Sequence, residues 1–384
     1  MRILICGIDG YIGWPLAIHL LNENHEVCGL DNFVRRKRVR MAGSNSLIPI
    51  PEPVRRATIL KQWKNFIDYP AEVDMTNYFM LDRVLEEFLP DAIVHLAEQP
   101  SAPWSMESPS QAGKTQYDNV LGTLNLLWTM KKHCPMSHLI KLGTMGEYGT
   151  PDCEIPEGEI PRPCLVHPRE LLCPMHGLPF PKSPNSFYHL SKVHDTNNII
   201  FACKTWGLRS TDIMQGIVFG LNETDNPNLL TRFDHDEHFG TVINRFCVQA
   251  IIGHTLTVYG RGGQTRGFLT LGDSIQCLSI ALENPPKAGE YRTFNQFENI
   301  YKVVELANMV AKVSSVPVAV GCISNPRKEA EQHYYNPTHQ KLFDLGYVPT
   351  TNVQGEIAKL IETILPYKDR VIEKVIMPKV KWND

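Results

Sequence analysis

The sequence lacks the cysteine and histidine patterns that build metal centres or disulfide scaffolds. Its ten cysteines are scattered, with no CxxC pair and no Cys/His cluster at the spacing of zinc ligands. Cysteines used in this way fit a reducing compartment, where they pack as thiols in the core. We therefore expect neither a bound metal nor a disulfide framework.

Long hydrophobic runs and an excess of one charge are also missing. No stretch approaches the roughly 18 apolar residues of a membrane span, and no charged leader with an apolar run precedes the first expected strand at Arg2. The 38 basic and 41 acidic residues give a net charge of −3, and the one basic run is Arg35–Arg38 with Arg40. We expect no membrane partner, no nucleic-acid partner, and a cytoplasmic protein or the processed form of a stromal one.

What the sequence does contain is the alternation of strand and helix patterns typical of an α/β fold. Helical periods are expected from Tyr11 to Leu21 and from about Asn119 to Lys132. The buried-strand candidates are Ile3–Cys6, Glu26–Leu30, Ala92–Leu96 and His138–Leu142. This βαβ pattern predicts a Rossmann-type, doubly wound parallel sheet.

The chain of 384 residues is long enough for a second, smaller domain. Residues 151–185 are rich in Pro and Cys without periodicity, which we interpret as a lid loop over the site. Asn, Asp and Pro become frequent through 220–228, where the chain is expected to pass into the smaller domain. We predict a Rossmann domain at 1–212 and a smaller C-terminal α/β substrate-binding domain at 213–384, with a segment at about 241–275 returning to the first domain.

A GxxGxxG motif follows the first expected strand directly and opens a helix. Its glycines permit a tight turn and close approach of the backbone to a pyrophosphate, which the N–H groups and dipole of the helix stabilise. A purely structural turn is the alternative. However, Asp31 ends the second strand 24 residues after Gly7, where a carboxylate binds the adenosine ribose. We assign the dinucleotide contacts of the turn to Gly7, Asp9, Gly10, Tyr11, Ile12 and Gly13.

The residues around Asp31 bear on the choice of dinucleotide. Asp31 favours NAD, because a carboxylate repels the extra 2′-phosphate of NADP. Arg35 and Arg36 argue the other way, unless they meet the pyrophosphate or belong to a solvated loop. Asp74 is a candidate contact to the adenine amino group, with a helix N-cap as the alternative. We predict NAD as the cofactor.

Tyr188 and Lys192 form a YxxxK motif, whose spacing places both side chains on one face of a helix. The Lys192 ammonium is expected to lower the pKa of the Tyr188 phenol, so that its oxygen accepts a proton from a sugar hydroxyl. The alternative is a surface helix pair. Thr144 follows the strand that ends at Leu142, where extended short-chain dehydrogenases place a hydroxyl beside the reacting oxygen. The three elements in this order resemble that superfamily, whose sites oxidise a carbinol carbon to give a keto-sugar.

The residues after Thr144 depart from nucleotide-sugar 4,6-dehydratases, which typically read Thr-Asp-Glu-x-Tyr-Gly. In Thr144–Gly149, Met145 replaces the acid and the carboxylate is displaced to Glu147. We expect Glu147 to deprotonate C5 of a 4-keto sugar, with a solvent-facing loop residue as the alternative. Met145 would clear space for a reagent at C6. His189 is the remaining proton carrier, unless it is a packed or surface histidine.

The run 143–151, Gly-Thr-Met-Gly-Glu-Tyr-Gly-Thr-Pro, resembles UDP-sulfoquinovose synthases rather than dehydratases. The resemblance covers nearly the whole chain and is carried further by 186–195, 244–250, 263–267, 325–327 and 376–378. It implies that UDP-glucose is oxidised at C4 with NAD, water is lost across C5 and C6, sulfite adds at C6, and the hydride returns to C4. By analogy it also implies a homodimer paired through two helices.

The same resemblance implies which residues contact the ligands. The dinucleotide contacts would include Asn32, Arg35 and Arg36, and we assign Met75, Leu96, Glu98, Asn119, Val218, Tyr188 and Lys192 to the same ligand. The UDP-sugar contacts would be Thr144, Tyr188, Gln215, Thr241, Asn244, Arg245, Thr257, Tyr259, Gln264, Arg266, Arg327 and Glu329. The guanidinium forks of Arg266 and Arg327 suit diphosphate oxygens, with surface ion pairs as the alternative.

One departure from the family pattern is Pro100, which stands where we expect an Arg facing the sugar and cofactor. Proline cannot donate a hydrogen bond, so either Gln99 or Ser101 rebuilds the sugar contact or the accepted sugar differs. Within enzymes, the rival functions are a nucleotide-sugar 4-epimerase and a plain 4,6-dehydratase. A non-catalytic NAD-sensing or scaffold protein is a rival from another class, because a fold alone does not fix function.

Overall fold

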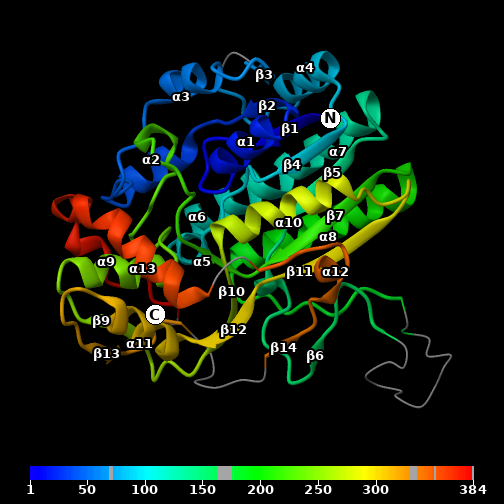
Figure 1. The fold of residues 1–384 in the computed structure, drawn as a ribbon. Coiled ribbons are helices and arrows are strands. Elements are labelled where there is room, and N and C mark those ends of the chain that lie inside the picture. Colours follow the sequence, from blue (N-terminus) through cyan, green and yellow to red (C-terminus); the bar gives the residue numbers. More distant parts are fainter. Residues whose placement is uncertain (69–71, 162–174, 176, 328–334, 350–351, 383–384) are drawn as a thin grey trace.

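The computed structural model describes residues 1–68, 72–161, 175, 177–327, 335–349 and 352–382 (Figure 1). Two groups of elements stand out in it. One large sheet with helices on both faces occupies most of the molecule, and short strands with three helices gather around the C-terminal end of the chain (Figure 1). Among the described residues, we find no helix that is both long and apolar enough to cross a membrane.

The large sheet has seven parallel strands in the order β11-β7-β5-β4-β1-β2-β3. The chain proceeds outward from β1 in both directions, as a doubly wound fold requires. The strands are β1 Arg2–Cys6, β2 Glu26–Leu30, β3 Phe66–Ile67, β4 Ala92–His95, β5 His138–Leu142, β7 Arg209–Gln215 and β11 Tyr291–Gln296. The predicted Rossmann-type fold is confirmed, and β2 and β5 occupy the residues expected for them.

Successive side chains of a strand point to opposite faces of the sheet, and both faces of this sheet are buried. Ile3 and Ile5 of β1 pack into one hydrophobic cluster, and Leu4 and Cys6 pack into another on the opposite face. Two helices cover the first face, α1 Gly13–Asn22 and α10 Leu271–Glu283, and three cover the second, α4 Tyr78–Phe88, α7 Gly122–His133 and α8 Phe187–Trp206.

The smaller domain has a hydrophobic core of its own, formed by three helices and short strands. The helices are α9 Val242–Ile251, α11 Val303–Val313 and α13 Val353–Ile364. A three-stranded sheet β12-β10-β8 and the pair β13-β9 complete it. Their bounds are β8 Ile217–Phe219, β9 Leu256–Tyr259, β10 Thr265–Thr270, β12 Asn299–Lys302 and β13 Val320–Ile323.

The remaining elements are short. The helices among them are α2 Val34–Met41, α3 Pro53–Leu60, α5 Ala102–Met106, α6 Pro109–Gln116 and α12 Gln340–Asp344, and the strands are β6 Glu154–Ile155 and β14 Asn336–Pro337. A π-helical turn, Tyr117–Leu121, joins α6 to α7. The 3-10 turns are Met145–Glu147, Pro227–Leu229, Leu365–Arg370 and Glu373–Val375.

The domain boundaries differ from the predicted ones. β7 runs through residue 212, so the first domain extends to Gln215. The segment that returns to the large sheet is 271–296, which holds α10 and β11, and the prediction of about 241–275 was wrong. α9 and β9 belong to the core of the smaller domain, which periodicity alone cannot reveal because it does not say which core a helix faces. Residues 162–174 and 176 of the predicted lid lie outside the described residues.

Candidate active site

A cavity of about 470 Å³, here called the main cavity, opens at the carboxyl ends of the large sheet's strands, where α/β sheets bind ligands. The residues after β1, β4 and β5 form one wall of it, and the smaller domain forms the other. A smaller pocket beside Asp31, here called the side pocket, shares Arg35, Leu96 and Glu98 with it.

The glycine turn after β1 is built for close approach of a ligand. Gly7 has a φ of 91°, and a Cβ there would lie 2.8 Å from the carbonyl carbon of Leu96. A Cβ on Gly13 would collide with the carbonyl oxygen of Gly7. Ile12 and Gly13 line the main cavity, and no side chain of the described chain caps the first turn of α1. The N–H groups and dipole of α1 therefore suit a pyrophosphate.

Asp31 lies where an adenosine ribose is expected. Its carboxylate accepts hydrogen bonds from the backbone N–H groups of Asp9, at 2.9 Å, and Phe33, at 2.7 Å. Burial raises the pKa of Asp31 to about 6, with the charge of Asp9 adding to the effect. Asp31 is still ionised at neutral pH, so it can accept hydrogen bonds from ribose hydroxyls.

The other predicted adenosine contacts lie around the side pocket. Asn32 and Asp74 line it and are joined by a hydrogen bond of 3.0 Å from Nδ2 to Oδ2. Asp74 is not the helix cap considered as its alternative, because Asn77 caps α4. Met75 lines the same pocket, whereas Val218 lines the main cavity.

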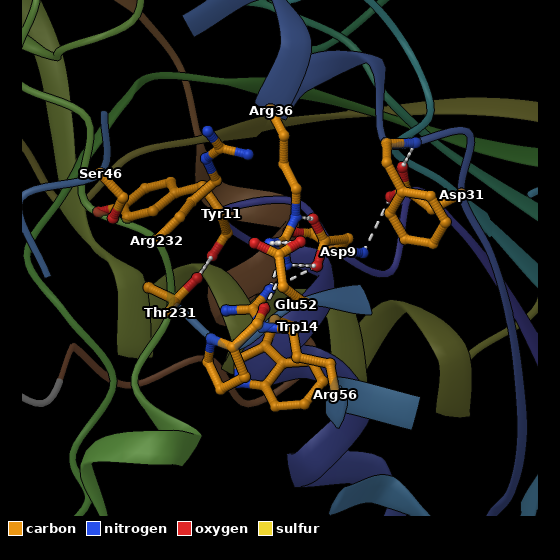
Figure 2. A network of polar contacts seen from close by, with 12 residues as sticks. Asp9, Tyr11, Trp14, Asp31, Arg36, Ser46, Glu52, Arg56, Thr231 and Arg232 are labelled. Atoms are coloured by element: carbon orange, nitrogen blue, oxygen red, sulfur yellow. Dashed lines mark hydrogen bonds and ion pairs between the residues drawn. The ribbon is translucent and has the colours of Figure 1, made fainter. Parts of the chain in front are cut away.

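Two predicted dinucleotide contacts, Asp9 and Arg36, instead bind each other (Figure 2). Arg36 donates to both carboxylate oxygens of Asp9, at 2.7 and 2.8 Å, and Arg56 donates to one of them at 2.9 Å. All three side chains are buried, and none lines either cavity. The assignment of Asp9 and Arg36 as ligand contacts is wrong in this structure. The three charged side chains instead hold the glycine turn against α2 and α3.

Asn119, a predicted dinucleotide contact, does not line either cavity. It is fully buried, its Oδ1 accepts from the Gln99 N–H at 2.7 Å, and its Nδ2 donates to Ser191 Oγ at 2.8 Å. It therefore joins the loop after β4 to α8. Gly10 likewise closes the turn, donating to Gly7 at 3.1 Å, while Tyr11 lines the main cavity with its hydroxyl bonded to Gly220 at 2.6 Å.

The catalytic constellation predicted from the sequence converges. Thr144, Tyr188 and Lys192, from the β5 loop and from α8, all line the main cavity. The Nζ of Lys192 lies 6.0 Å from the centre of the Tyr188 ring, donates to the carbonyl oxygen of Leu142 and forms an ion pair with Glu98. A hydroxyl, a phenol and an amine therefore meet beside the glycine turn.

The net pKa shift of Tyr188 is opposite to the predicted one. Burial raises the pKa of the phenol above its usual value, and the Lys192 ammonium lowers it by less. The negative charge of Glu98 adds to the increase. Lys192 lowers the pKa of Tyr188, as expected, but the sequence could not show how deeply the phenol is buried.

Glu147 does not face the ligand, and its assignment as the base at C5 is wrong in this structure. Its carboxylate is fully buried behind the cavity wall, where it pairs with Lys141 at 3.1 Å and with Lys182, and accepts from Thr196 at 3.1 Å. Although burial pushes its pKa up, the two lysines hold it down to about 2. Glu147 does not line the main cavity, and both of its carboxylate oxygens are engaged by these partners, so it does not reach a sugar bound there.

The imidazole of His189 fills the space beside Gly146. A Cβ on Gly146 would collide with the imidazole of His189, and both residues line the main cavity with Met145. The Nδ1 of His189 lies 2.6 Å from Asn185 Oδ1 and 2.9 Å from Ser186 Oγ. With the ring proton on Nδ1, donated to Asn185, Nε2 is left as an acceptor. Burial, together with the charge of Arg327, lowers the pKa of His189 to about 3, so the ring is neutral.

The smaller domain supplies most of the predicted sugar-nucleotide contacts. The main cavity is lined by Gln215, Thr241, Arg245, Thr257, Tyr259, Gln264, Arg266 and Arg327. Asn244 is buried instead, accepting from the Gly220 N–H at 3.0 Å, so its assignment as a contact is not supported. Glu329 lies outside the described residues. For the others, ligand contact stays a prediction.

Neither Gln99 nor Ser101 is free to replace the sugar contact that Pro100 cannot make. Gln99 points away from the main cavity and donates to Thr115 at 2.9 Å. Ser101 lines the cavity, but its hydroxyl donates to the carbonyl oxygen of His238 and accepts from the Trp104 N–H at 3.0 Å. Gln99 is therefore excluded as a sugar contact in this structure. Ser101 could donate to the sugar only if it lost its hydrogen bond to the carbonyl oxygen of His238.

Arg38 and Trp382 are among the residues on the cavity wall that sequence reasoning missed. Arg38 lines both cavities and pairs with Asp118, and its place in the basic run was the available signal. Trp382 lines the main cavity from the end of the described chain, and no motif surrounds it.

Comparisons with known proteins match the whole chain. The model of the NAD dependent epimerase/dehydratase family matches residues 3–295. The chain is 44% identical to the chloroplastic UDP-sulfoquinovose synthase of Spinacia oleracea, over all of this chain and 79% of that one. It is also 44% identical to the UDP-sulfoquinovose synthase of Sulfolobus acidocaldarius, over all of this chain and 98% of that one.

Solved structures share the fold at lower identity. A UDP-glucose 4-epimerase of Thermotoga maritima matches with a TM-score of 0.70 and 18% identity, over 94% of this chain and 98% of that one. A UDP-glucuronic acid 4-epimerase of Bacillus cereus, in complex with NAD, matches with a TM-score of 0.69 and 21% identity, over 95% and 99%.

Proposed function

Because the chain belongs to the NAD-dependent epimerase/dehydratase family and, within it, to the UDP-sulfoquinovose synthases, we propose that it makes UDP-sulfoquinovose from UDP-glucose and sulfite. The observation that carries this proposal is the convergence of Thr144, Tyr188, Lys192 and His189 on one cavity. The first three are the groups of a sugar-oxidising site, and the fourth fills the space above Gly146.

NAD is the cofactor of the enzyme. The turn from Gly7 to Gly13 would hold its pyrophosphate, the ionised Asp31 its adenosine ribose, and Lys192 its nicotinamide ribose. Bound NAD supplies a hydride acceptor that later returns the hydride, so no net oxidation occurs. Glu98 beside Lys192 keeps the ammonium charged, because their ion pair raises the pKa of Lys192 against the effect of burial.

The oxidation begins with proton removal from the C4 hydroxyl. Tyr188 accepts this proton, since it lies in the cavity wall beside the Lys192 ammonium. Thr144 donates a hydrogen bond to the same oxygen; its own hydroxyl already accepts from the Gly146 N–H at 3.1 Å, which orients it. Loss of hydride from C4 then leaves a ketone, which acidifies the C5–H bond.

His189 is the group best placed to move the C5 proton. Its imidazole occupies the place where a dehydratase glutamate at position 146 would stand, and its Nε2 is unprotonated. It takes the C5 proton and passes it to the C6 hydroxyl, which leaves as water. Bisulfite then attacks C6 through sulfur and its proton goes to C5, the hydride returns to C4, and Tyr188 returns its proton to the C4 oxygen. The sum is UDP-glucose plus bisulfite giving the sulfonate plus water.

The nucleotide end of the substrate would lie against the smaller domain. Arg266 and Arg327 carry guanidinium groups toward the cavity, and such groups pair with diphosphate oxygens in two places at once. Arg245 donates to the Tyr259 hydroxyl at 2.9 Å, which orders the same wall. These contacts place the sugar ring toward Tyr188.

Product mass tests the reaction. The protein is incubated with NAD and UDP-glucose, with sulfite, with sulfate or with neither, and the products are read by mass spectrometry. A sulfonate is expected with sulfite alone, because sulfate has no lone pair on sulfur to attack C6. A new product that separates from UDP-glucose on chromatography but has the same mass would instead indicate an epimerase. A dehydrated 4-keto product that forms equally with and without sulfite would indicate a dehydratase. Either result would end the proposal.

We also propose that two copies pair through α7 and α8. Four large apolar side chains are exposed along these helices and the turns before them, at Tyr117, Trp128, Phe187 and Phe201. Trp206 joins Trp128 and Phe201 into one patch, with ring centres 4.7 and 6.1 Å from it. Exposed aromatic side chains gathered in this way are typical of a protein interface.

Sedimentation velocity tests the pairing. The unchanged protein is expected to be a dimer at micromolar concentration, and Trp128→Glu combined with Phe201→Glu is expected to give a folded monomer, because two charges would be buried in the interface. Val54→Glu, at an 81% exposed site on α3, serves as the control and should stay dimeric. A monomeric parent protein, or a double variant that stays dimeric, refutes the pairing.

A reducing compartment such as the cytoplasm is the proposed location. The eight cysteines in the described part of the chain are free thiols, and six of them are buried. Burial raises the pKa of the Cys28 and Cys277 thiols to about 12, so they stay protonated and unreactive.

A further inference from the structure

The last described residues of the chain reach the main cavity. Trp382 lines it together with Arg327 and Tyr259 of the smaller domain. Before it, Val375 and Ile376 are buried, and Ile376 packs into the core of the smaller domain. Residues 371–382, here called the C-terminal tail, therefore pack against the folded structure.

Glu237 holds the tail in place. Its carboxylate accepts from the backbone N–H groups of Lys379, at 2.6 Å, and Val380, at 2.9 Å. Its own N–H donates to the carbonyl oxygen of Val375 at 2.9 Å. Glu237 is 7% exposed and itself lines the main cavity. A buried carboxylate that accepts from two backbone groups fixes both the course and the depth of the tail.

The tail ends against the guanidinium of Arg327. The ring centre of Trp382 lies 5.4 Å from the Arg327 Cζ, and the Tyr259 ring centre lies 6.0 Å from the same atom. The Trp382 N–H donates to the carbonyl oxygen of Pro326 at 3.1 Å, so backbone and side chain of the tryptophan both contact the segment that carries Arg327. These distances lie within the range of cation–π interactions.

We infer that Trp382 is a positioning residue for nucleotide-sugar binding, which holds Arg327 ready for the diphosphate of the ligand. The inference rests on the proposed function for the identity of that ligand. An arginine side chain has many rotamers, and a ligand must otherwise order it at a cost in affinity. The indole restricts these rotamers before binding, so the tail contributes to affinity without contacting the reacting carbon atoms.

Titration calorimetry on the full chain tests this role with UDP, uridine and NAD as separate probes. Trp382→Ala is expected to weaken UDP binding roughly 5- to 30-fold, as the loss of a cation–π contact implies. Uridine has no diphosphate and NAD binds elsewhere, so both should keep their affinities. Trp382→Phe should restore most of the UDP affinity. Trp63→Ala, which removes a partly buried indole that lines neither cavity, serves as the control and should bind UDP normally.

A double-mutant cycle separates positioning from direct contact. Arg327→Ala should itself weaken UDP binding, and adding Trp382→Ala to it should cost no more than about twofold further, because the tryptophan acts through the arginine. In steady-state assays, Trp382→Ala should raise KM for UDP-glucose and leave kcat unchanged.

Three results would overturn the inference. They are a Trp382→Ala variant that binds UDP within twofold of the parent protein, an equal loss of uridine and UDP affinity, and additive losses in the cycle. A parent protein that binds no UDP would refute the proposed function instead, so the two failures are distinguishable.

Discussion

Replacing Tyr188 with phenylalanine is expected to lower kcat roughly 10²- to 10⁴-fold, the contribution typical of a general base. Phenylalanine keeps the ring and its packing but has no oxygen to accept the C4 proton. NAD affinity should stay within about twofold, because Lys192 and the glycine turn are unchanged. The measurements are sulfonate formation by mass spectrometry and NAD binding by calorimetry.

The control is Tyr117→Phe, which removes a hydroxyl from a 57% exposed side chain on the turn before α7 and should leave kcat unchanged. Turnover of Tyr188→Phe within tenfold of the parent protein would show that the phenol is not the base. Because burial raises the pKa of Tyr188, kcat of the parent protein should rise with pH as the phenol ionises. The variant should lose this limb of the profile.

Replacing Glu147 with glutamine is expected to lower the free energy of unfolding by about 3–5 kcal/mol, as when one partner of a buried ion pair is removed. The substitution removes one of the two carboxylates paired with the fully buried ammonium of Lys141 and leaves Asp212, at 3.2 Å. It also takes from Lys182 its carboxylate partner. Urea unfolding at pH 7 measures the change. Glu26→Gln breaks the surface pair with Arg2, which is 41% exposed, and should cost less than about 1 kcal/mol.

The pH dependence of stability gives a second measurement of the same carboxylate. The pKa of Glu147 is about 2 in the folded protein, below its usual value of 4.5. Its contribution to stability is therefore fully present above about pH 4.5 and is lost as the pH falls toward 2. Glu147→Gln should flatten this part of the profile. A variant that unfolds like the parent protein but turns over 100-fold more slowly would restore Glu147 as the catalytic base and contradict the structure.

The sequence predicts best what depends on neighbouring residues. The buried-strand patterns of β2 and β5, the spacing of the glycines and the four-residue interval between Tyr188 and Lys192 are local patterns. The order of these motifs along the chain then places them at one edge of a parallel sheet. This is why the fold and the convergence of Thr144 with the YxxxK pair followed from the sequence.

Long-range contacts account for the predictions that failed. Glu147 lies on a 3-10 turn, where a shift of one residue moves a side chain about a third of the way round the axis. Its partner Lys182 is 35 residues away, and nothing in the Thr144 motif indicates this pairing. The pairing of Asp9 with Arg36 and Arg56 likewise joins a turn to two separate helices. Trp382 was missed because its partners, Arg327 and Pro326, are far from it in sequence.

The packing of His189 over Gly146 restricts how this site could change its chemistry. A side chain introduced at position 146 would occupy the volume of the imidazole, so a glutamate cannot enter there unless position 189 shrinks at the same time. Reducing position 189 first would remove a proton acceptor before its replacement arrives. A lineage passing between this turn and the Thr-Asp-Glu turn of a dehydratase would therefore have to cross an inactive intermediate or change both positions together.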